Sequence, residues 1–530
     1  MASFRPSDHI DAAPQAPELP KLGPVGFARF VWRQLTSMRT ALVLLLLLAL
    51  AAVPGSLVPQ RTSDPNGVLQ FQARDPEGFA ILDSLGVFST FSSPWFSAIY
   101  LLLFVSLIGC IIPRSRHHFE ALRSRPPKTP ARLSRLVGFT SVETTVDAET
   151  AVHAARRLLK SQRYRVERYG DSISAERGYL RETGNLVFHT ALVGVLAGVA
   201  IGGGFGYNGQ RLLIEGEPFA NVLADYDSFF PGPWVDPDTS LEPFGLRLDA
   251  FDSEYEFDQD ARTWHPLDFE ATMGVRDGGG DWRAATLKVN SPLEVGGTQV
   301  YLLANGYAPV VTVRDPDGEI VYRQAVPFLA TDGNLTSGGV IKVPDGLSDQ
   351  LGMQGFFYPD AVANDLGALT SFSPNLTENA LLTLFVFRGD LGLADGRGAN
   401  VYTLDTENME QLAGREDALA LQIGDTVDLP DGMGTLELES VATYVGLDIH
   451  HDPAQAWVLG FALAAVGGLL TSLFIPRRRM WIKVVSGADG TRVEYAGLAR
   501  GEDPGLAVAV AELARAHTEA LGTPSRPNVG

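Results

Sequence analysis

The sequence predicts a membrane protein with four transmembrane α-helices, a large β-rich extracytoplasmic domain and a small cytoplasmic α/β insert. Three observations support this fold class. Apolar residues gather in four runs, each close to the roughly 17–25 residues that a bilayer demands of a spanning helix. Lysine and arginine cluster beside particular ends of these runs. The stretch 207–456 alternates short β-branched and aromatic runs with turn residues.

The four spanning helices are expected where the apolar runs are uninterrupted by charge. They cover residues 40–58, 96–112, 186–206 and 457–475. The first run could instead be a signal peptide. Its length, the lack of a small-x-small cleavage site with a clean mature start, and the three later runs favour a retained helix.

The orientation follows from the basic residues beside the helix ends. Lysine and arginine are concentrated in 1–39, 113–185 and 476–530, whereas the connection 59–95 has two arginines beside four acidic residues. Cytoplasmic segments of membrane proteins carry the excess of Lys and Arg. We therefore expect a multi-pass protein of the plasma membrane in which the N-terminal tail 1–39, the insert 113–185 and the C-terminal tail 476–530 are cytoplasmic, with 59–95 and 207–456 outside.

The parts outside the spans have their own patterns. The segment 298–328 contains Asn-Gly and Asp-Pro-Asp-Gly turn signals between β-branched runs, which predicts hairpins. In the insert, residues 146–178 predict one helix followed by two short strands. The first ~20 residues and the last ten or so are expected to be disordered tails.

Charge and cysteine usage exclude several classes of function. A net charge of -20 argues against nucleic-acid binding, which needs a basic face. The single cysteine, Cys110, rules out an intramolecular disulfide, CxxC redox chemistry and a Cys-type zinc site. No Ser/His/Asp constellation or pair of carboxylates predicts a catalytic centre.

His189 stands in the third run, LVFHTALVGVLAGVAIGGGFG, about one turn from the end expected at the cytoplasmic face. Ionisable groups within a span usually have a function, so the side chain is a candidate metal or haem ligand, or a proton-relay residue. A relay is less attractive because no Asp or Glu occurs in any of the four runs. The alternative is an interfacial histidine that donates to a carbonyl or a lipid phosphate.

Glycines on the same helix predict how it packs. Gly194, Gly198 and Gly202 recur every four residues, a spacing that lets a neighbouring helix approach closely. At 100° per residue, Gly194 lies about 140° and Gly198 about 180° from His189. The glycine face should therefore pack one way while His189 points the other.

Other candidate residues carry weaker signals. His450 and His451 precede the fourth helix; as neighbours they diverge in direction, and they could equally belong to a polar turn beside the membrane. Cys110, at the end of the second helix, is read as a small membrane hydrophobe, with a reactive thiol or haem contact as the alternative. His117 and His118 are interpreted as part of a basic surface facing lipid.

Four blocks of the sequence resemble the ResB family, membrane proteins of the system II pathway of cytochrome c biogenesis. The blocks are RQLTSMRTALVLL, RGYLRETGNLVFHTALVGVLAGVAIGGGFGYNGQ, KVNSPLEVGGTQVYLLANGYAP and GLDIHHDPAQAWVLGFALAAVGGLLTSLFIPRRRMWIKV. They match in order, and the resemblance covers most of residues 30–485.

The resemblance implies that the chain works with a ResC-like membrane protein, which supplies a tryptophan-rich haem-binding segment. Together they would carry haem b across the membrane and present it to the thiols of apocytochrome c. The axial-ligand histidine of the family maps onto His189; the same role is less secure for His450 or His451. Arg177 and Arg181, just before the third helix, could meet the haem propionates. The chain would be a component of a haem-attachment complex with no catalytic constellation of its own.

Three other functions compete with this reading. An electron-transfer cytochrome b would hold haem between histidines of its own helices, but only one histidine lies in a span. A sensor would need an output module inside, where the segments are small. The third is a membrane scaffold or chaperone that binds no haem and docks apocytochrome or another secreted partner.

Overall fold

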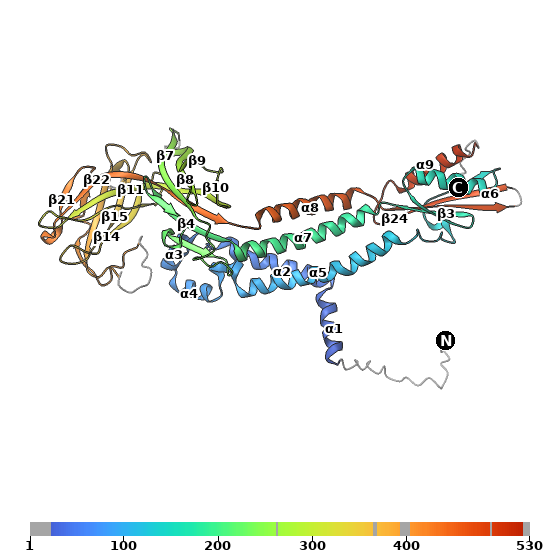
Figure 1. The fold of residues 1–530 in the computed structure, drawn as a ribbon, viewed down its shortest axis with the longest axis horizontal. Coiled ribbons are helices and arrows are strands. Elements are labelled where there is room, and N and C mark those ends of the chain that lie inside the picture. The colour runs from blue at the N-terminus through green and yellow to red at the C-terminus, as the bar shows by residue number, and fades with distance from the viewer. Residues whose placement is uncertain (1–22, 261–262, 364–367, 393–402, 488–489, 523–530) are drawn as a thin grey trace, which may run out of the picture. The chain divides into compact units, whose positions relative to one another are not determined.

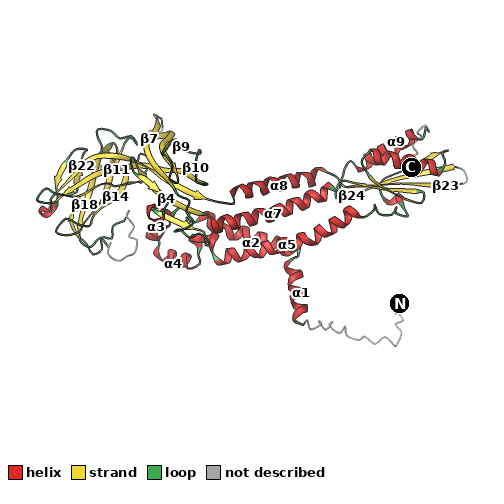
Figure 2. Ribbon diagram, in the orientation of Figure 1, coloured by secondary structure: helices red, strands yellow, loops and turns green. Residues whose placement is uncertain are grey.

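The computed structural model describes residues 23–260, 263–363, 368–392, 403–487 and 490–522. The two expected disordered tails fall largely on residues 1–22 and 523–530, which lie outside these ranges. Contacts divide the chain into two compact units: a helical unit, Met1–Val199 with Gln455–Gly530, and a β unit, Ala200–Ala454. Figure 1 follows the chain through both, and Figure 2 shows that the helical unit carries the long helices and one sheet, whereas the β unit is built mainly of strands.

Four helices among the described residues are long and apolar enough to cross a membrane, which confirms the predicted number. They are α2 (Met38–Leu57), α5 (Pro94–Arg123), α7 (Leu180–Phe205) and α8 (Gln455–Phe474). Two of them run further than the apolar pattern predicts. The helix α5 continues past Pro113 through a charged segment, and α7 begins six residues before the apolar run at residue 186.

A short helix, α1 (Pro24–Leu35), precedes α2, and side chains of α5 stabilise the break between them. The Ser106 hydroxyl donates to the Leu35 carbonyl at 2.7 Å, and the Cys110 thiol donates to the Thr36 carbonyl at 2.9 Å. The last carbonyls of a helix lack partners within it, so these bonds satisfy the end of α1. The connection from α2 to α5 holds α3 (Pro65–Arg74), α4 (Pro76–Ser84) and a 3₁₀ turn, η1 (Val87–Ser92), around the fully buried Phe88.

The predicted α/β insert is one half of a larger domain. Its five-stranded antiparallel sheet has the order β1-β24-β23-β3-β2, so strands from the insert pair with strands that follow the fourth span. The strands are β1 (Val137–Thr144), β2 (Arg165–Tyr169), β3 (Ser172–Arg177), β23 (Arg478–Gly487) and β24 (Gly490–Ala499). The C-terminal segment, expected as a tail, therefore completes a folded domain.

Two helices cover one face of this sheet (Figure 1), α6 (Ala148–Ser161) and α9 (Leu506–Ala520). Their apolar stripes pack on the sheet residues Ile173, Ile482 and Tyr495, all of them buried. His517 of α9 is fully buried: its Nε2 donates to the Ala151 carbonyl at 3.0 Å, and its Nδ1 lies 2.8 Å from the Tyr495 hydroxyl. Burial lowers the pKa of His517.

The β unit confirms the large β-rich region. Its principal sheets have the orders β10-β11-β22-β4-β6, β13-β14-β15-β18-β19 and β5-β7-β8-β9. The strands are β4 (Tyr207–Ile214), β5 (Pro218–Ala220), β6 (Ser228–Pro231), β7 (Phe244–Asp258), β8 (Thr263–Asp277), β9 (Arg283–Lys288), β10 (Leu293–Val295), β11 (Thr298–Arg314), β12 (Ile320–Ala325), β13 (Leu329–Ala330), β14 (Ser337–Val343), β15 (Leu351–Tyr358), β16 (Ala361–Ala363), β17 (Leu369–Ser371), β18 (Leu381–Arg388), β19 (Glu410–Ala413), β20 (Leu419–Leu421), β21 (Thr426–Asp428) and β22 (Thr435–His451).

Two long strands, β11 and β22, pair along their whole length and pass through both large cores of this unit. One core gathers around Val300, Leu447 and Ile449, and the other around Val313 and Leu436. Because both cores share the same two strands, the His450–His451 end of β22 is held firmly by its pairing with β11 and β4.

Candidate functional site

His189 lies on α7 with one ring nitrogen engaged. Its Nδ1 is 2.7 Å from the backbone carbonyl oxygen of Asn185, one turn earlier. A carbonyl oxygen only accepts hydrogen bonds, so Nδ1 must carry the proton. In the neutral ring, Nε2 is then a bare lone pair, and it has no hydrogen-bond partner among the described residues. Histidines that ligate metals have this arrangement, with the second nitrogen fixed by a carbonyl. The alternative of an interfacial histidine that donates to a carbonyl expects the same bond.

The surroundings of His189 hold its ring in place without covering it. The Phe188 ring packs edge-on at 5.0 Å between centroids, and the side chain of His189 is half-buried. Glu182 lies seven residues earlier, which places it about 20° away around the helix and about 10 Å along it. His189 therefore shares a face of α7 with the acidic residue near the start of that helix.

The opposite face of α7 packs closely on α8, as the glycine spacing predicts. A Cβ at Gly194 would lie 2.5 Å from the Phe461 ring, and one at Gly198 would lie 2.7 Å from Val458. The contact continues at Gly184, where a Cβ would meet the Gly468 carbonyl oxygen at 2.7 Å. Larger side chains would force the helices apart, so the glycines fix which side of α7 His189 occupies.

His118 is buried against α7, so its interpretation as a lipid-facing residue is wrong. Its side chain is 8% exposed; Nε2 lies 3.0 Å from the Thr183 hydroxyl, and Nδ1 lies 3.5 Å from a Glu182 carboxylate oxygen. The sequence pattern missed this because α5 continues beyond Pro113. That continuation carries His118 onto the start of α7. Further along, the Tyr100 hydroxyl of α5 donates to the Leu196 carbonyl of α7.

Glu182 also belongs to a buried network of charges where the spanning helices join the α/β domain. Arg477 binds both Glu182 and Glu176, with Nη2 at 2.7 Å from the Glu176 carboxylate. Tyr179 and Arg479 donate to Glu176 at 2.9 and 3.0 Å. Burial opposes ionisation of Glu176, but these donors outweigh it and hold its pKa below the usual value. The arginines that follow the fourth span are thus internal ion-pair partners.

The two predicted propionate-binding arginines are already engaged within the helical unit. The Arg177 guanidinium lies over the Tyr164 ring, 4.6 Å from its centroid. Arg181 donates from Nη1 to the Arg500 carbonyl at 2.8 Å. Both side chains remain partly exposed, so each guanidinium keeps N–H groups that could meet an anion.

Cys110 has a structural contact. Its thiol donates to the Thr36 carbonyl, and the neighbouring Gly109 packs against the Thr36 side chain. These contacts place the thiol at the break between α1 and α2.

His450 and His451 point to opposite faces of β22, as neighbours on a strand must. His451 stacks on the Tyr207 ring with centroids 5.2 Å apart, and its Nδ1 lies 3.1 Å from the Gly297 carbonyl oxygen. His450 is exposed. His450 lies on the same face of β22 as Asp448. Burial raises the pKa of the Asp448 carboxyl, and the electrostatic interaction with His450 acts in the opposite direction.

A chain of hydrogen bonds extends from His451 into the β unit. Thr298 lies 3.3 Å from His451 Nδ1 and 3.1 Å from the Tyr207 hydroxyl. The Asn221 amide donates to that hydroxyl at 3.1 Å and accepts from Tyr226 at 2.6 Å. His451 Nδ1 is therefore one end of an internal network, while its Nε2 has no hydrogen-bond partner among the described residues.

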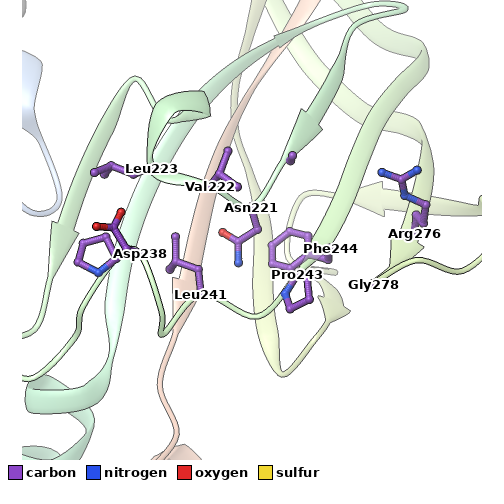
Figure 3. Close-up of a pocket in the computed structure, with 11 residues that line it drawn as sticks. Asn221, Val222, Leu223, Asp238, Leu241, Pro243, Phe244, Arg276 and Gly278 are labelled. Carbon is purple, nitrogen blue, oxygen red and sulfur yellow. The ribbon is translucent and has the colours of Figure 1, made fainter.

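Asn221 also lies in a hollow of about 330 Å³. Figure 3 shows its amide near the middle of the labelled residues, with Leu241 and Phe244 beside it and Arg276 to one side. Its side-chain atoms are already bound within the fold. No predicted site residue lines this hollow, and no group of three or more His, Cys, Asp or Glu in the described part of the chain could hold a metal ion.

Comparison with known proteins identifies the family. The chain is 26% identical to the cytochrome c biogenesis protein CcsB of Synechococcus sp. (strain RCC307), over 88% of this chain and 91% of the relative. It is 24% identical to CcsB of Synechococcus sp. (strain WH7803), over 91% and 96% of the two chains. The match to CcsB of Gloeobacter violaceus is 26% identical and spans 56% of this chain and 63% of that relative, just under two thirds of its length.

The family model described as the ResB-like family matches residues 38–511, which include all four spanning helices and most of the α/β domain. The chain belongs to the ResB family.

Proposed function

We propose that this protein receives haem b as cargo, ligates its iron through His189, and carries it across the membrane for attachment to apocytochrome c. Its partner in this work is a ResC-like membrane protein that supplies a tryptophan-rich haem-binding segment. The observation that supports the proposal best is the Nδ1–H bond of His189 to the Asn185 carbonyl. The relatives that are named cytochrome c biogenesis proteins agree with this role.

The residues around His189 have separate tasks in this proposal. The Asn185 carbonyl fixes the tautomer and aims the ring, so that Nε2 is available to iron without a proton having to leave. The glycine face packs α7 onto α8. On the face of His189, α5 contacts α7 at Glu182 and Leu196, seven residues to either side, and the His189 ring between these contacts stays half-buried. Haem contributes an iron that accepts an imidazole nitrogen and two propionates that need cationic partners. Arg177, just before α7, and Arg181, in its first turn, are the nearest cations along the chain on the N-terminal side of His189.

The two histidines of β22 differ in their suitability as further contacts. His451 is occupied by stacking on Tyr207 and by bonds to Gly297 and Thr298. His450 is exposed, so of the two it is the candidate for contact with haem or with the partner. Cys110 has no part in the proposed transfer.

The proposed orientation places the α/β domain in the cytoplasm and the β unit outside. It is supported by the concentration of Lys and Arg in the segments around the α/β domain. The whole chain has a net charge of -20, and much of its acid lies in the stretch 207–456. An acidic outer unit would steer a basic apocytochrome toward the complex.

The test is covalent haem attachment to a reporter c-type cytochrome in cells that carry this chain and its partner. We expect His189→Ala to lower haem staining of the reporter by about 10-fold or more, because a ligand is lost. Added imidazole should restore part of the staining by filling the vacated position. The matched control is His153→Ala, which removes an exposed histidine of α6.

Equal staining in both variants, at equal protein levels, would contradict the ligand role. It would favour a scaffold that docks apocytochrome or another secreted partner without binding haem.

A further inference from the structure

A basic hollow of about 550 Å³ lies in the helical unit where α8 ends and α7 begins. Its lining includes Arg163, Arg165 and Arg177 on the polar side, and Leu180 and Phe474 on the apolar side. Leu180 and Phe474 are 58% and 74% exposed. Because they belong to the ends of membrane-capable helices, the hollow lies at the depth where a bilayer changes from acyl chain to headgroup.

The charge of the lining is strongly positive. Its one acidic residue, Glu176, is buried and already bound by Tyr179, Arg477 and Arg479. Three guanidinium groups therefore share the hollow with no other carboxylate among its lining residues; Asp503, outside the lining, interacts electrostatically with Arg177. Guanidinium groups bind phosphate and carboxylate through paired N–H donors.

The three arginines differ in how far the fold uses them. Arg165 donates to the Leu122 and Arg123 carbonyls at the end of α5, and Arg177 stacks on Tyr164. Arg163 is exposed, and its side chain makes no hydrogen bond or ion pair with another described residue. Its backbone adopts φ +61, which non-glycine residues seldom do. The fold thus fixes the Arg165 and Arg177 side chains and leaves the Arg163 guanidinium available to bind an anion.

We propose that this hollow binds the anionic head of an amphiphile whose apolar body lies against Leu180 and Phe474. Two sources have this chemistry: the phosphate of an acidic phospholipid, and the carboxylates of haem. The phospholipid source is independent of the proposed haem transport, whereas the haem source rests on it. In either case the recognition is by Arg163 and Arg177, with Arg165 adding to the field.

The experiment compares two double variants of the purified full chain that remove equal charge. The first double variant, Arg163→Gln with Arg177→Gln, removes two guanidinium groups from the lining of the hollow. Arg156→Gln with Arg157→Gln removes two exposed arginines of α6 that do not line it. Native mass spectrometry then measures retention of phosphatidylglycerol against phosphatidylcholine, and fluorescence quenching measures binding of haemin.

We expect the hollow variant to lose about 10-fold or more in affinity for one of the two probes, since each basic residue at a membrane surface contributes to anion binding. Loss for phosphatidylglycerol alone identifies a lipid site, and loss for haemin alone identifies a haem site. Equal behaviour of the two double variants for both probes overturns the proposal.

Two further measurements keep the result interpretable. Arg163→Gln alone changes an exposed side chain and removes no hydrogen bond or ion pair among the described residues, so it should fold normally and show a smaller loss of the same probe even if the double variant is unstable. Reporter staining in His189→Ala tests the haem function separately, so a failed hollow and a failed haem role give different outcomes.

Discussion

One histidine of each unit has its Nδ1 beside a backbone carbonyl, but the surroundings of the two rings differ. His189 in the helical unit and His451 in the β unit each hold Nδ1 within hydrogen-bond distance of a backbone carbonyl. Beyond that bond, His451 is stacked on Tyr207 and bonded to Thr298, while the ring contact of His189 among the described residues is the edge of Phe188. In both rings Nε2 has no hydrogen-bond partner among the described residues, so the difference lies in the surroundings. His189 stands in a membrane-capable helix, whereas His451 is stacked on an aromatic ring and joined to a side-chain network of the β unit.

The two units also differ in the interactions that hold the parts of each unit together. The β unit relies on apolar cores that share β11 and β22. The helical unit has an apolar sheet core too, but the junction between its spanning helices and its sheet is made of ion pairs. Mutations at that junction should therefore behave unlike mutations in an apolar core.

The largest effect is expected from breaking the buried ion pair of the helical unit. Arg477→Met removes the common partner of Glu176 and Glu182. Glu176 keeps Tyr179 and Arg479 but loses its buried guanidinium partner, which should lower the free energy of unfolding by up to about 3–5 kcal/mol. Hydrogen exchange of the β23 amides measures the loss.

The double variant Arg477→Met with Glu176→Leu should recover part of this loss, because the buried carboxylate that lost Arg477 is gone. A double variant no more stable than Arg477→Met would show that the junction does not depend on this pair.

Overpacking the α7–α8 contact should have an intermediate effect. Gly198→Leu forces a side chain into Val458, and such changes typically lower stability by about 1–3 kcal/mol. Thermal unfolding should shift to lower temperature. Gly203→Leu is the matched control, because nothing lies within 4 Å of a Cβ at Gly203. Equal shifts for both glycines would contradict the proposed packing face.

His451→Phe should have a smaller effect, confined to the β unit. The ring can still stack on Tyr207, but the bonds to the Gly297 carbonyl and the Thr298 hydroxyl are lost, which should lower stability by about 1 kcal/mol. Denaturant unfolding followed by hydrogen exchange at the end of β22 measures it. A loss of haem staining as large as that of His189→Ala would break the contrast between the two histidines.

The stability of the α/β domain is also expected to depend on pH. Because burial lowers the pKa of His517, the folded domain resists a proton that the unfolded chain accepts. Stability should be full above pH ~6.5 and fall as the pH drops below it, by at most about 1.4 kcal/mol per pH unit.

His517→Phe should remove this slope, whatever its effect on absolute stability, whereas His153→Asn, at an exposed position, should leave it. The check is the pH series of unfolding midpoints between pH 7.5 and 5 (chosen to bracket the usual histidine range). A slope that persists in His517→Phe would assign it to other groups.

Local patterns predicted much of this fold. The four apolar runs gave the four spanning helices, the turn-rich stretch gave the β unit, and the spacing of Gly194 and Gly198 gave the face that packs on α8. These features depend on neighbouring residues, which is why they are visible in the chain.

The features that could not be predicted join distant segments. Pairing of β3 with β23 brings Glu176 to Arg477, about 300 positions apart, and no local period records it. Pro113 marked an end to the second helix, but α5 continues and buries His118. The tautomer of His189 depends on a backbone carbonyl, which every residue possesses, so the sequence alone could not specify it.

The most direct test is the absorption spectrum of the chain purified with its ResC-like partner, comparing wild type, His189→Ala and His451→Ala. If His189 is the haem ligand, we expect that only His189→Ala loses or shifts the Soret band and that added imidazole restores it. A Soret band unchanged in His189→Ala, or lost equally in His451→Ala, would contradict the assignment of His189 as the haem ligand.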